Sequence, residues 1–277
     1  GYINKSVPKH VEILLVMGNC QYYKMDSIQD YAIVNEMVNL AKRVAPGYQG
    51  LINAVLKKTF TETFRLSQTE DKVLDLSINT STPKWITSLL VSQYGFSTSE
   101  KLLNHNQTEA PLYLRVNSVK ATEFDILNDY PVLKIDNDLI GQQSFLKSEA
   151  LSSGLVVVQD KTSQKICTLF DLIGSERILD ACSAPGTKTS QLATMVPSGE
   201  VVAVELHEHR AKLVSDLMKR LSIENVTTVV SDICDINSDE QFDAILCDVP
   251  CSGLGVLRRK PDLKYRMSSI DLDALQV

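Results

Sequence analysis

Apolar residues recur at every third or fourth position through most of the N-terminal part of the chain, which is the spacing of one face of an amphipathic helix. The segment 31–44 predicts one such helix, and a second is predicted from Gly50 onward. The run 11–17 predicts a third helix, more buried than the other two. We therefore expect a small all-α domain at the N-terminus.

The pattern stays helical over 83–106, with a break at Gly95 and with Ser99 placed to cap a short second helix. Short alternating runs follow at 112–116 and 155–158, separated by Asn, Asp, Gly and Ser. These runs predict a helical linker followed by a small α+β subdomain.

Strands and amphipathic helices alternate regularly after residue 160. This order is typical of a doubly wound parallel sheet, whose ligands bind at the carboxyl ends of the strands. The predicted elements, in chain order, are helix 164–173, strand 177–180, helix 187–195, strand 200–205, a helix through 213–221, strand 226–232 and strand 242–248.

Three carboxylates stand at or just past the ends of predicted strands: Asp180, Glu205 and Asp232. In an open parallel sheet such positions face one crevice. The loop Cys182–Lys188 is rich in small residues, so its backbone can approach a ligand closely. Glu205 follows Gly186 by about 20 residues, the spacing at which a carboxylate meets the ribose of an adenosine cofactor. One such acid alone is more often a helix cap or a solvated turn, but three together indicate a nucleotide site.

A single glycine in this loop limits the choice of nucleotide. A nicotinamide site should read GxGxxG, and a phosphate-binding loop should read GxxxxGK followed by Ser or Thr. The loop has neither pattern, so no cradle for a pyrophosphate is predicted. A cofactor with a nucleoside but no phosphate fits better, and S-adenosylmethionine is that cofactor.

The last predicted strand leads into Asp248-Val-Pro-Cys251-Ser-Gly, which places a carboxylate and a thiol close together at the mouth of the crevice. This pair suits chemistry at C5 of a pyrimidine, because C5 of cytosine becomes nucleophilic only after a thiolate adds at C6 and a carboxylic acid stabilises protonated N3. Taken alone, Cys251 is more often an ordinary loop cysteine.

A basic segment follows, and it holds one acidic residue against five basic ones, namely Arg258, Arg259, Lys260, Lys264 and Arg266. Such a run is usually a solvated face. Beside a base-modifying site it predicts contacts to backbone phosphates of RNA. Replacing Arg258 and Arg259 with Ala is then expected to weaken RNA binding and to lower its log–log salt dependence by roughly one to two units.

Composition limits these interpretations. Apolar residues make up 44% of the chain, the net charge is −6 and the pI is near 5.3, so any contact with nucleic acid must be a local patch. No apolar run is long enough to span a bilayer. Six cysteines without a CxxC pair indicate free thiols in a reducing compartment, so we expect a cytoplasmic protein. We also expect a monomer.

The other cysteines and the histidines are assigned no chemistry. Cys20, Cys167 and Cys247 fall in apolar runs and are expected in the core. His207 and His209 are expected on a solvated surface, since neighbouring positions on a helix do not converge on one ion. No metal site is predicted.

Taken together, these segments resemble a known family. The runs Leu179–Thr189 and Asp248–Asp262, with Asp271-Leu272 and Leu275-Gln276, are similar to the RNA 5-methylcytosine methyltransferases of the Sun/RsmB/NOL family. The segments 30–38 and 50–58 resemble the NusB-like RNA-binding domain of the ribosomal RNA methyltransferases in that family. Leu114–Asn117 is similar to the start of its RNA-recognition subdomain.

The resemblance implies an α/β Rossmann-like methyltransferase core, incomplete here, preceded by an all-α NusB-like domain and a small α+β subdomain. The implied limits are 1–75 for a partial NusB-like domain, 76–159 for the linker and subdomain, and 160–277 for the methyltransferase domain. The chain looks like the middle of a longer protein.

The resemblance also implies roles for residues. Glu205 matches the acid at the cofactor ribose, Asp232 the acid on the adenine side, and Asp248 the carboxylate at cofactor and cytosine. Cys251 matches the cysteine that assists product release. The cofactor loop matches Cys182, Ser183, Ala184, Pro185, Gly186, Thr187 and Lys188.

Two positions depart from the family pattern. Thr187 stands where a second glycine is common, and Glu205 stands where aspartate is common. The attacking cysteine of the family lies in a Thr-Cys motif, and no such dipeptide occurs in the chain. We expect that cysteine beyond Val277, so the chain as printed is expected not to methylate RNA.

The leading hypothesis is an enzyme that transfers a methyl group from S-adenosylmethionine to C5 of a cytosine in RNA, most of all in small-subunit ribosomal RNA. The alternative is a non-catalytic RNA-binding protein with a vestigial methyltransferase domain. A Thr-Cys motif in the full gene would distinguish the two. A nicotinamide-dependent oxidoreductase is a distant third, disfavoured by the loop.

Overall fold

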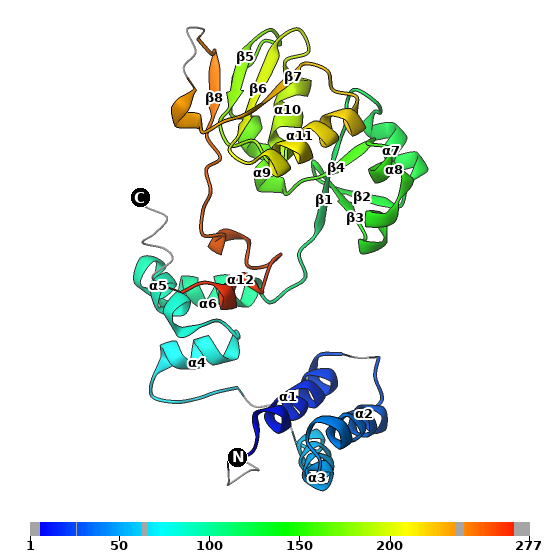
Figure 1. The fold of residues 1–277 in the computed structure, drawn as a ribbon, viewed down its shortest axis with the longest axis vertical. Helices are drawn as coiled ribbons and strands as arrows, with labels where there is room; N and C mark the ends of the chain where they lie inside the picture. Colours follow the sequence, from blue (N-terminus) through cyan, green and yellow to red (C-terminus); the bar gives the residue numbers. More distant parts are fainter. Residues whose placement is uncertain (1–5, 26, 63–65, 237–240, 269–277) are drawn as a thin grey trace. The chain divides into compact units, whose positions relative to one another are not determined.

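Figure 1 draws the computed structural model, which describes residues 6–25, 27–62, 66–236 and 241–268. The chain divides into two compact units, a first unit of residues 1–81 and a second unit of residues 82–277. The linker, the small subdomain and the parallel sheet all belong to the second unit. The domain limits expected from the sequence stay predictions, and the family-like runs at 271–272 and 275–276 lie outside the described residues.

The first unit is helical, as the sequence predicts. Its core joins one face of α1 to α2 and α3, through residues such as Leu14, Met37 and Leu56. The expectation that the first of these helices is the most buried is wrong, because Val16 is 68% exposed and Met17 also reaches the surface. The helices are α1 (Lys9–Lys24), α2 (Asp30–Val44), α3 (Gln49–Phe60) and α4 (Lys72–Asn79).

The linker of the second unit is a pair of helices, α5 (Lys84–Tyr94) and α6 (Phe96–His105), separated by Gly95. Gly95 has a φ of +75°, which glycine adopts without strain. Ser99 does not cap a helix as expected. It is buried inside α6, and its hydroxyl donates to the Gly95 carbonyl at 2.8 Å.

The α+β subdomain predicted next is present as a four-stranded antiparallel sheet in the order β2-β3-β1-β4. Its core includes Leu114, Ile126, Phe145 and Val156. The sequence pattern did not predict the hairpin of β2 and β3, because β2 is exposed over most of its length. The elements are β1 (Leu112–Val116), α7 (Glu123–Asp129), β2 (Val132–Ile135), β3 (Asp138–Gly141), η1 (Gln143–Lys147), α8 (Glu149–Ser152) and β4 (Val156–Val158).

The α/β part contains a parallel sheet in the order β7-β6-β5-β8, so the predicted Rossmann-like arrangement is confirmed. The first helix runs from Lys161 to Cys167 rather than over 164–173, because Asp160 caps it by accepting from the Thr162 N–H. The other elements are β5 (Arg177–Asp180), α10 (Thr187–Met195), β6 (Glu200–Glu205), α11 (Glu208–Leu221), β7 (Val226–Val230), η2 (Ile233–Asp235), β8 (Ala244–Leu246), η3 (Leu254–Val256) and α12 (Leu263–Arg266).

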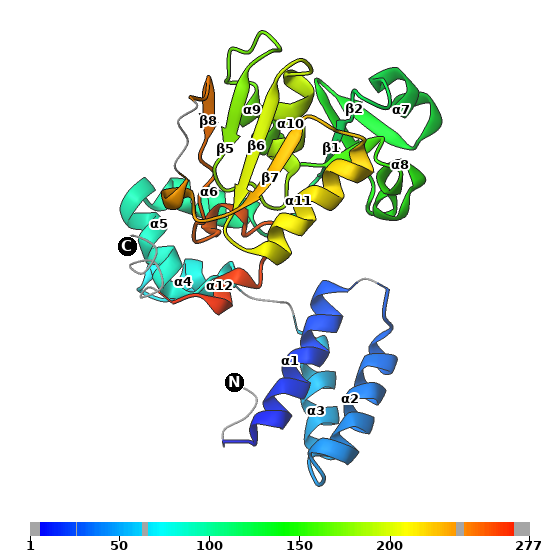
Figure 2. The ribbon, with the colours of Figure 1, turned by 45° about the horizontal axis from the view of Figure 1, so that its top comes forward.

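The two faces of this sheet are covered differently. On one face Ile178 and Val201 pack against α9 (Lys161–Cys167), α10 and α11, and Figure 2 shows α11 lying along the sheet beside β7. On the other face Leu179, Val202 and Val204 form a small buried cluster, against which Phe242 packs. Within the described ranges no helix is long and apolar enough to cross a membrane.

Candidate active site

A cavity of about 410 Å³ lies at the carboxyl ends of the parallel strands. Each of the four strands contributes a segment, because parallel strands all end at the same edge of the sheet. This is the crevice that the sequence predicted. The cavity is lined by Ala181, Cys182, Ala184, Glu205, Leu206, His207, Arg210, Ser231, Asp232, Ile233, Asp248, Val249, Pro250 and Cys251.

The loop after β5 is held in place by β6 and by α11. The Ser183 hydroxyl donates to the Val204 carbonyl at 3.0 Å, which ties the loop to β6. Gly186 has a φ of +97°, and a Cβ there would lie 3.2 Å from the Val214 Cα. Only glycine therefore allows α10 to begin this close to α11. Cys182 and Ala184 face the cavity.

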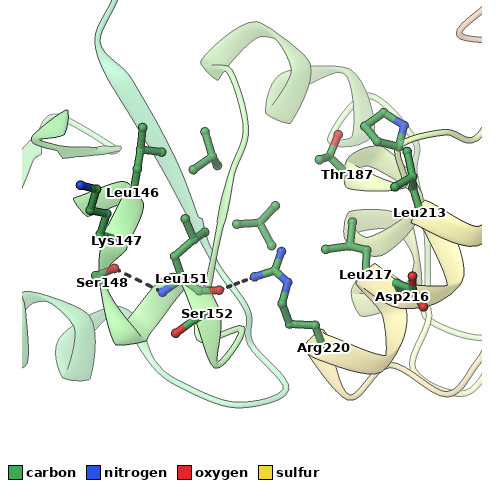
Figure 3. A pocket seen from close by; sticks show the side chains of 13 residues that line it. Leu146, Lys147, Ser148, Leu151, Ser152, Thr187, Leu213, Asp216, Leu217 and Arg220 are labelled. Carbon is green, nitrogen blue, oxygen red and sulfur yellow. Dashed lines mark hydrogen bonds between the residues drawn. The ribbon is translucent and has the colours of Figure 1, made fainter. Parts of the chain in front are cut away.

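Two predicted cofactor residues of this loop lie elsewhere. Pro185 and Thr187 line a second pocket of about 660 Å³, which separates the small subdomain from α10 and α11. Figure 3 shows Thr187, Leu213 and Leu217 on one side of this pocket and Leu151 on the other, with the Arg220 guanidinium donating to the Leu151 carbonyl. The loop therefore lies between two pockets, and the strand-end acids Glu205 and Asp232 line the first of them.

Glu205 reaches the cavity from the end of β6 and is only 3% exposed. Its carboxylate accepts from the backbone N–H of His207 at 3.3 Å and pairs with the Arg210 guanidinium at 3.3 Å. Arg210 also donates to the Ala184 carbonyl at 3.3 Å. Arg210 was not predicted, because only the packing of α11 brings a cation in its first turn back to the strand end.

His207 also lines the cavity, although it was expected only on a solvated surface. Its ring is exposed and stacks on that of His209, with centroids 5.6 Å apart. Among the described residues no group of three or more His, Cys, Asp or Glu side chains could hold a metal ion.

The other two predicted strand-end acids differ in position. Asp232 lines the cavity, and its Oδ1 accepts from the Cys234 N–H at 2.9 Å. Asp180 does not line it. Asp180 is buried beneath the loop and accepts from the Thr189 hydroxyl at 2.7 Å, and burial raises the pKa of this carboxyl to about 6. Asp180 therefore supports the loop instead of facing a ligand.

Asp248 supplies the third carboxylate of the cavity and forms an ion pair with Lys188 of α10. Lys188 therefore contacts Asp248 and does not itself line the cavity. Cys251 and Cys182 are the two thiols in the lining. Burial, and next the Glu205 carboxylate, raise the pKa of Cys182, which keeps it a neutral thiol and a weak nucleophile.

The three cysteines expected in the core have different surroundings. Cys167 is fully buried, and burial raises its pKa to about 11. The expectation is wrong for Cys20 and Cys247, which are exposed. Both stand in apolar runs of sequence, and which positions in such a run face inward depends on the neighbouring elements.

Several side chains of the basic segment already have partners or are buried within the second unit. Arg258 donates to main-chain carbonyls, Arg259 pairs with a carboxylate, and Lys264 is only 7% exposed. Lys260 and Arg266 are exposed. Arg266 pairs with Asp262 at 3.1 Å on the surface. The predicted RNA contacts stay a prediction.

The folds of two solved structures are similar to this chain. A methyltransferase homologue from Pyrococcus horikoshii matches with a TM-score of 0.59 at 24% identity, over 71% of this chain and 69% of that one. NSun6 from the same organism, solved with SFG, matches with a TM-score of 0.62 at 16% identity, over 69% of this chain and 76% of that one. At these identities the similarity concerns the fold alone.

Three family models match consecutive parts of the sequence. The model of the 16S rRNA methyltransferases RsmB/F matches 167–277, the NusB family matches 4–60, and the ferredoxin-like domain of RsmF/B-like methyltransferases matches 82–130.

Curated relatives agree with these models. A probable ribosomal RNA small subunit methyltransferase B of Bacillus subtilis is 32% identical over 99% of this chain, which spans 67% of that relative's length. A ribosomal RNA small subunit methyltransferase B of Yersinia pseudotuberculosis is 30% identical over 83% of this chain and 56% of its own length. The fold is thus that of a methyltransferase. The chain belongs to the RsmB/F family of 16S rRNA methyltransferases.

Proposed function

We propose that the full-length protein transfers a methyl group from S-adenosylmethionine to C5 of a cytosine in RNA, and that its substrate is small-subunit ribosomal RNA. One observation carries this proposal. A single cavity at the strand ends joins Glu205 and Asp232 to Asp248 and Cys251 of the Pro-Cys-Ser-Gly loop. Membership of the RsmB/F family supports the ribosomal substrate.

The cavity suits S-adenosylmethionine in size and charge. Its volume of about 410 Å³ falls within the range of small-molecule pockets. Three carboxylates complement a cationic sulfonium and a ribose with two hydroxyl donors. We assign Glu205 to the ribose and Asp232 to the adenine side, with Cys182 and Ala184 of the loop against the ligand. Arg210 holds the Glu205 carboxylate toward the cavity.

The bound cofactor supplies an electrophilic methyl group, and the remaining chemistry belongs to the protein. Asp248 would accept a hydrogen bond from protonated N3 of the cytosine and so stabilise the ring once a thiolate has added at C6. Lys188 keeps the Asp248 carboxylate at the cavity mouth through their ion pair. The neutral thiol of Cys182 is unsuited to attack. We assign the attack to the Thr-Cys cysteine of longer family members and the later elimination to Cys251.

The partner and location follow from this activity. We propose that the second unit presents a flipped or single-stranded cytosine to the cavity and that the NusB-like first unit adds affinity for RNA. An enzyme of ribosomal RNA works where that RNA is made, so we place the protein in the cytoplasm. We propose that it acts as a monomer.

The cofactor assignment is tested by calorimetry on the full-length protein. Glu205→Ala removes charge-assisted hydrogen bonds to the ribose, and we expect the binding free energy of S-adenosylmethionine to weaken by about 2 to 4 kcal/mol. The control is Glu208→Ala, in the first turn of α11 and outside the cavity lining. Unchanged affinity in Glu205→Ala would remove this residue from the site.

The role of Cys251 is tested with tritiated methyl transfer and denaturing electrophoresis. Full-length Cys251→Ala should still attack cytosine but release it slowly, so a covalent protein–RNA adduct should accumulate. Cys234→Ala, an exposed cysteine outside the cavity lining, is the matched control and should turn over normally. Normal turnover of Cys251→Ala without adduct would contradict the assignment.

A further inference from the structure

The first two arginines of the basic segment form hydrogen bonds and an ion pair with other residues of the second unit. Arg258 donates from Nη2 to the Glu109 carbonyl at 2.6 Å and from Nε to the Thr108 carbonyl at 3.4 Å. Both acceptors lie in the connection between α6 and β1. Two of the N–H groups of this guanidinium are therefore taken by main-chain carbonyls and not by a ligand.

Arg259 forms more contacts within the chain than Arg258 does. Its Nε donates to Asp160 Oδ2 at 2.9 Å, its Nη2 pairs with the same carboxylate, and its Nη1 donates to the Pro111 carbonyl at 3.0 Å. The guanidinium also lies 5.8 Å from the centre of the Tyr113 ring. Three of the five guanidinium N–H groups therefore have acceptors within the chain, and the side of the fork formed by Nε and Nη2 is taken by Asp160.

The partners of Arg259 are themselves fixed parts of the scaffold. Asp160 caps α9 by accepting from the Thr162 N–H at 2.9 Å. Tyr113 is a residue of β1, paired with Ile140 in the small sheet. Arg258, Arg259 and these partners, which we call the clasp, therefore join the chain just after Cys251 to the start of the small sheet and to the first helix of the methyltransferase core.

We propose that the clasp holds the Cys251 loop over the cavity, and that Arg258 and Arg259 are positioning residues for methyl transfer instead of phosphate ligands. Six residues separate Cys251 from Arg258, and the last of them, Leu257, is buried. Together with Leu257, the clasp fixes the segment that follows the cavity. Contacts to phosphates then fall to the exposed Lys260 and to Arg266, whose pair with Asp262 lies at the surface. This proposal rests on the proposed methyltransferase function.

The two roles of Arg259 differ in what a lysine can replace. A phosphate ligand needs charge, so Arg259→Lys should keep most of the activity and most of the salt dependence of RNA binding. A clasp needs the planar fork, so Arg259→Lys should fail almost as badly as Arg259→Ala. Asp160→Asn removes the partner's charge without touching the basic segment, and it should reproduce the defect.

The test measures single-turnover methyl transfer by the full-length protein, and RNA affinity against salt. We expect Arg259→Ala, Arg259→Lys and Asp160→Asn each to slow transfer about tenfold or more, with the log–log salt slope within a few tenths of the unaltered protein. Lys260→Ala is the matched control and should lower the slope by about one. A slope lowered by one in Arg259→Ala, together with rescue by Arg259→Lys, would overturn the proposal.

Hydrogen exchange gives a readout that does not depend on activity. Amides over 249–259 should exchange faster in Arg259→Ala than in the unaltered protein, while those of α10 stay protected. Unchanged exchange over 249–259 would contradict the clasp. Absence of methyl transfer in the unaltered full-length protein would instead contradict the proposed function, and the exchange experiment would still decide whether the clasp exists.

Discussion

Asp180 links stability to pH at the level of a single residue. It is 1% exposed, lies beneath the cofactor loop, and accepts from the Thr189 hydroxyl. Burial raises its pKa from the ordinary 3.8 to about 6 in the folded chain. The folded state therefore binds this proton more tightly than the unfolded state does. Its contribution to stability is fully present below pH 4 and is lost as pH rises through about 6.

Asp180→Asn should remove this dependence. Between pH 4 and pH 7 the free energy of unfolding of the unaltered protein should fall by up to about 3 kcal/mol through this group, and that of the variant should not. Thr189→Val removes a hydrogen bond to the charged form and should move the loss to higher pH. Denaturant unfolding at a series of pH values measures both. Equal pH profiles for Asp180→Asn and the unaltered protein would contradict the assignment.

The sequence predicted which acidic residues stand at strand ends better than it predicted which of their side chains are buried. Glu205, Asp232 and Asp248 were placed at strand ends, and all three line the cavity. Asp180 satisfied the same rule but faces the core beneath the loop. Arg210 could not be predicted, because its contact with Glu205 depends on how α11 packs. A position along the sequence gives the end of a strand, but the direction of a side chain there depends on neighbours distant in the chain.

At the scale of elements, buried strands and their connecting helices followed the sequence closely. The bounds of β5, α10 and β6 agree with the predicted ranges, because Gly186 and continuous apolar runs mark where each begins and ends. The hairpin of β2 and β3 was not predicted, since an exposed strand carries no strong alternation. Helix α9 began earlier than predicted because its N-cap, Asp160, and not its apolar pattern, fixed its start.

The conformation of the cofactor loop depends on Gly186, where the chain turns into α10. Its φ of +97° disfavours alanine, and the Cβ of Gly186→Ala would crowd the α11 backbone at Val214. We expect a loss of roughly 1 to 3 kcal/mol in the free energy of unfolding. Weaker binding of S-adenosylmethionine should accompany it, since α10 must shift. Gly255→Ala is the control, because a Cβ there meets open space. Equal stability of the two variants would show that the loop tolerates a side chain.

At the scale of the whole molecule, the chain contains separate cores. The main core of the first unit is formed by residues of α1, α2 and α3 and their connections. The cores of the second unit lie in the small sheet and on the two faces of the parallel sheet. No residue is shared between the two sets in the part of the chain that the structure describes. The cavity belongs to the second unit, so we expect that cofactor binding and RNA affinity can be separated by deletion.

Removing residues 1–81 from the full-length protein tests this separation. Every residue that lines the cavity belongs to the second unit, so calorimetry should give an S-adenosylmethionine affinity within about twofold of the undeleted protein. RNA affinity should fall, because we propose that the NusB-like first unit binds RNA. Methyl transfer to a short RNA at saturating concentration should persist. Loss of cofactor affinity would mean that the first unit supports the cavity. Unchanged RNA affinity would remove the first unit from RNA recognition and leave it to the exposed cations of the basic segment.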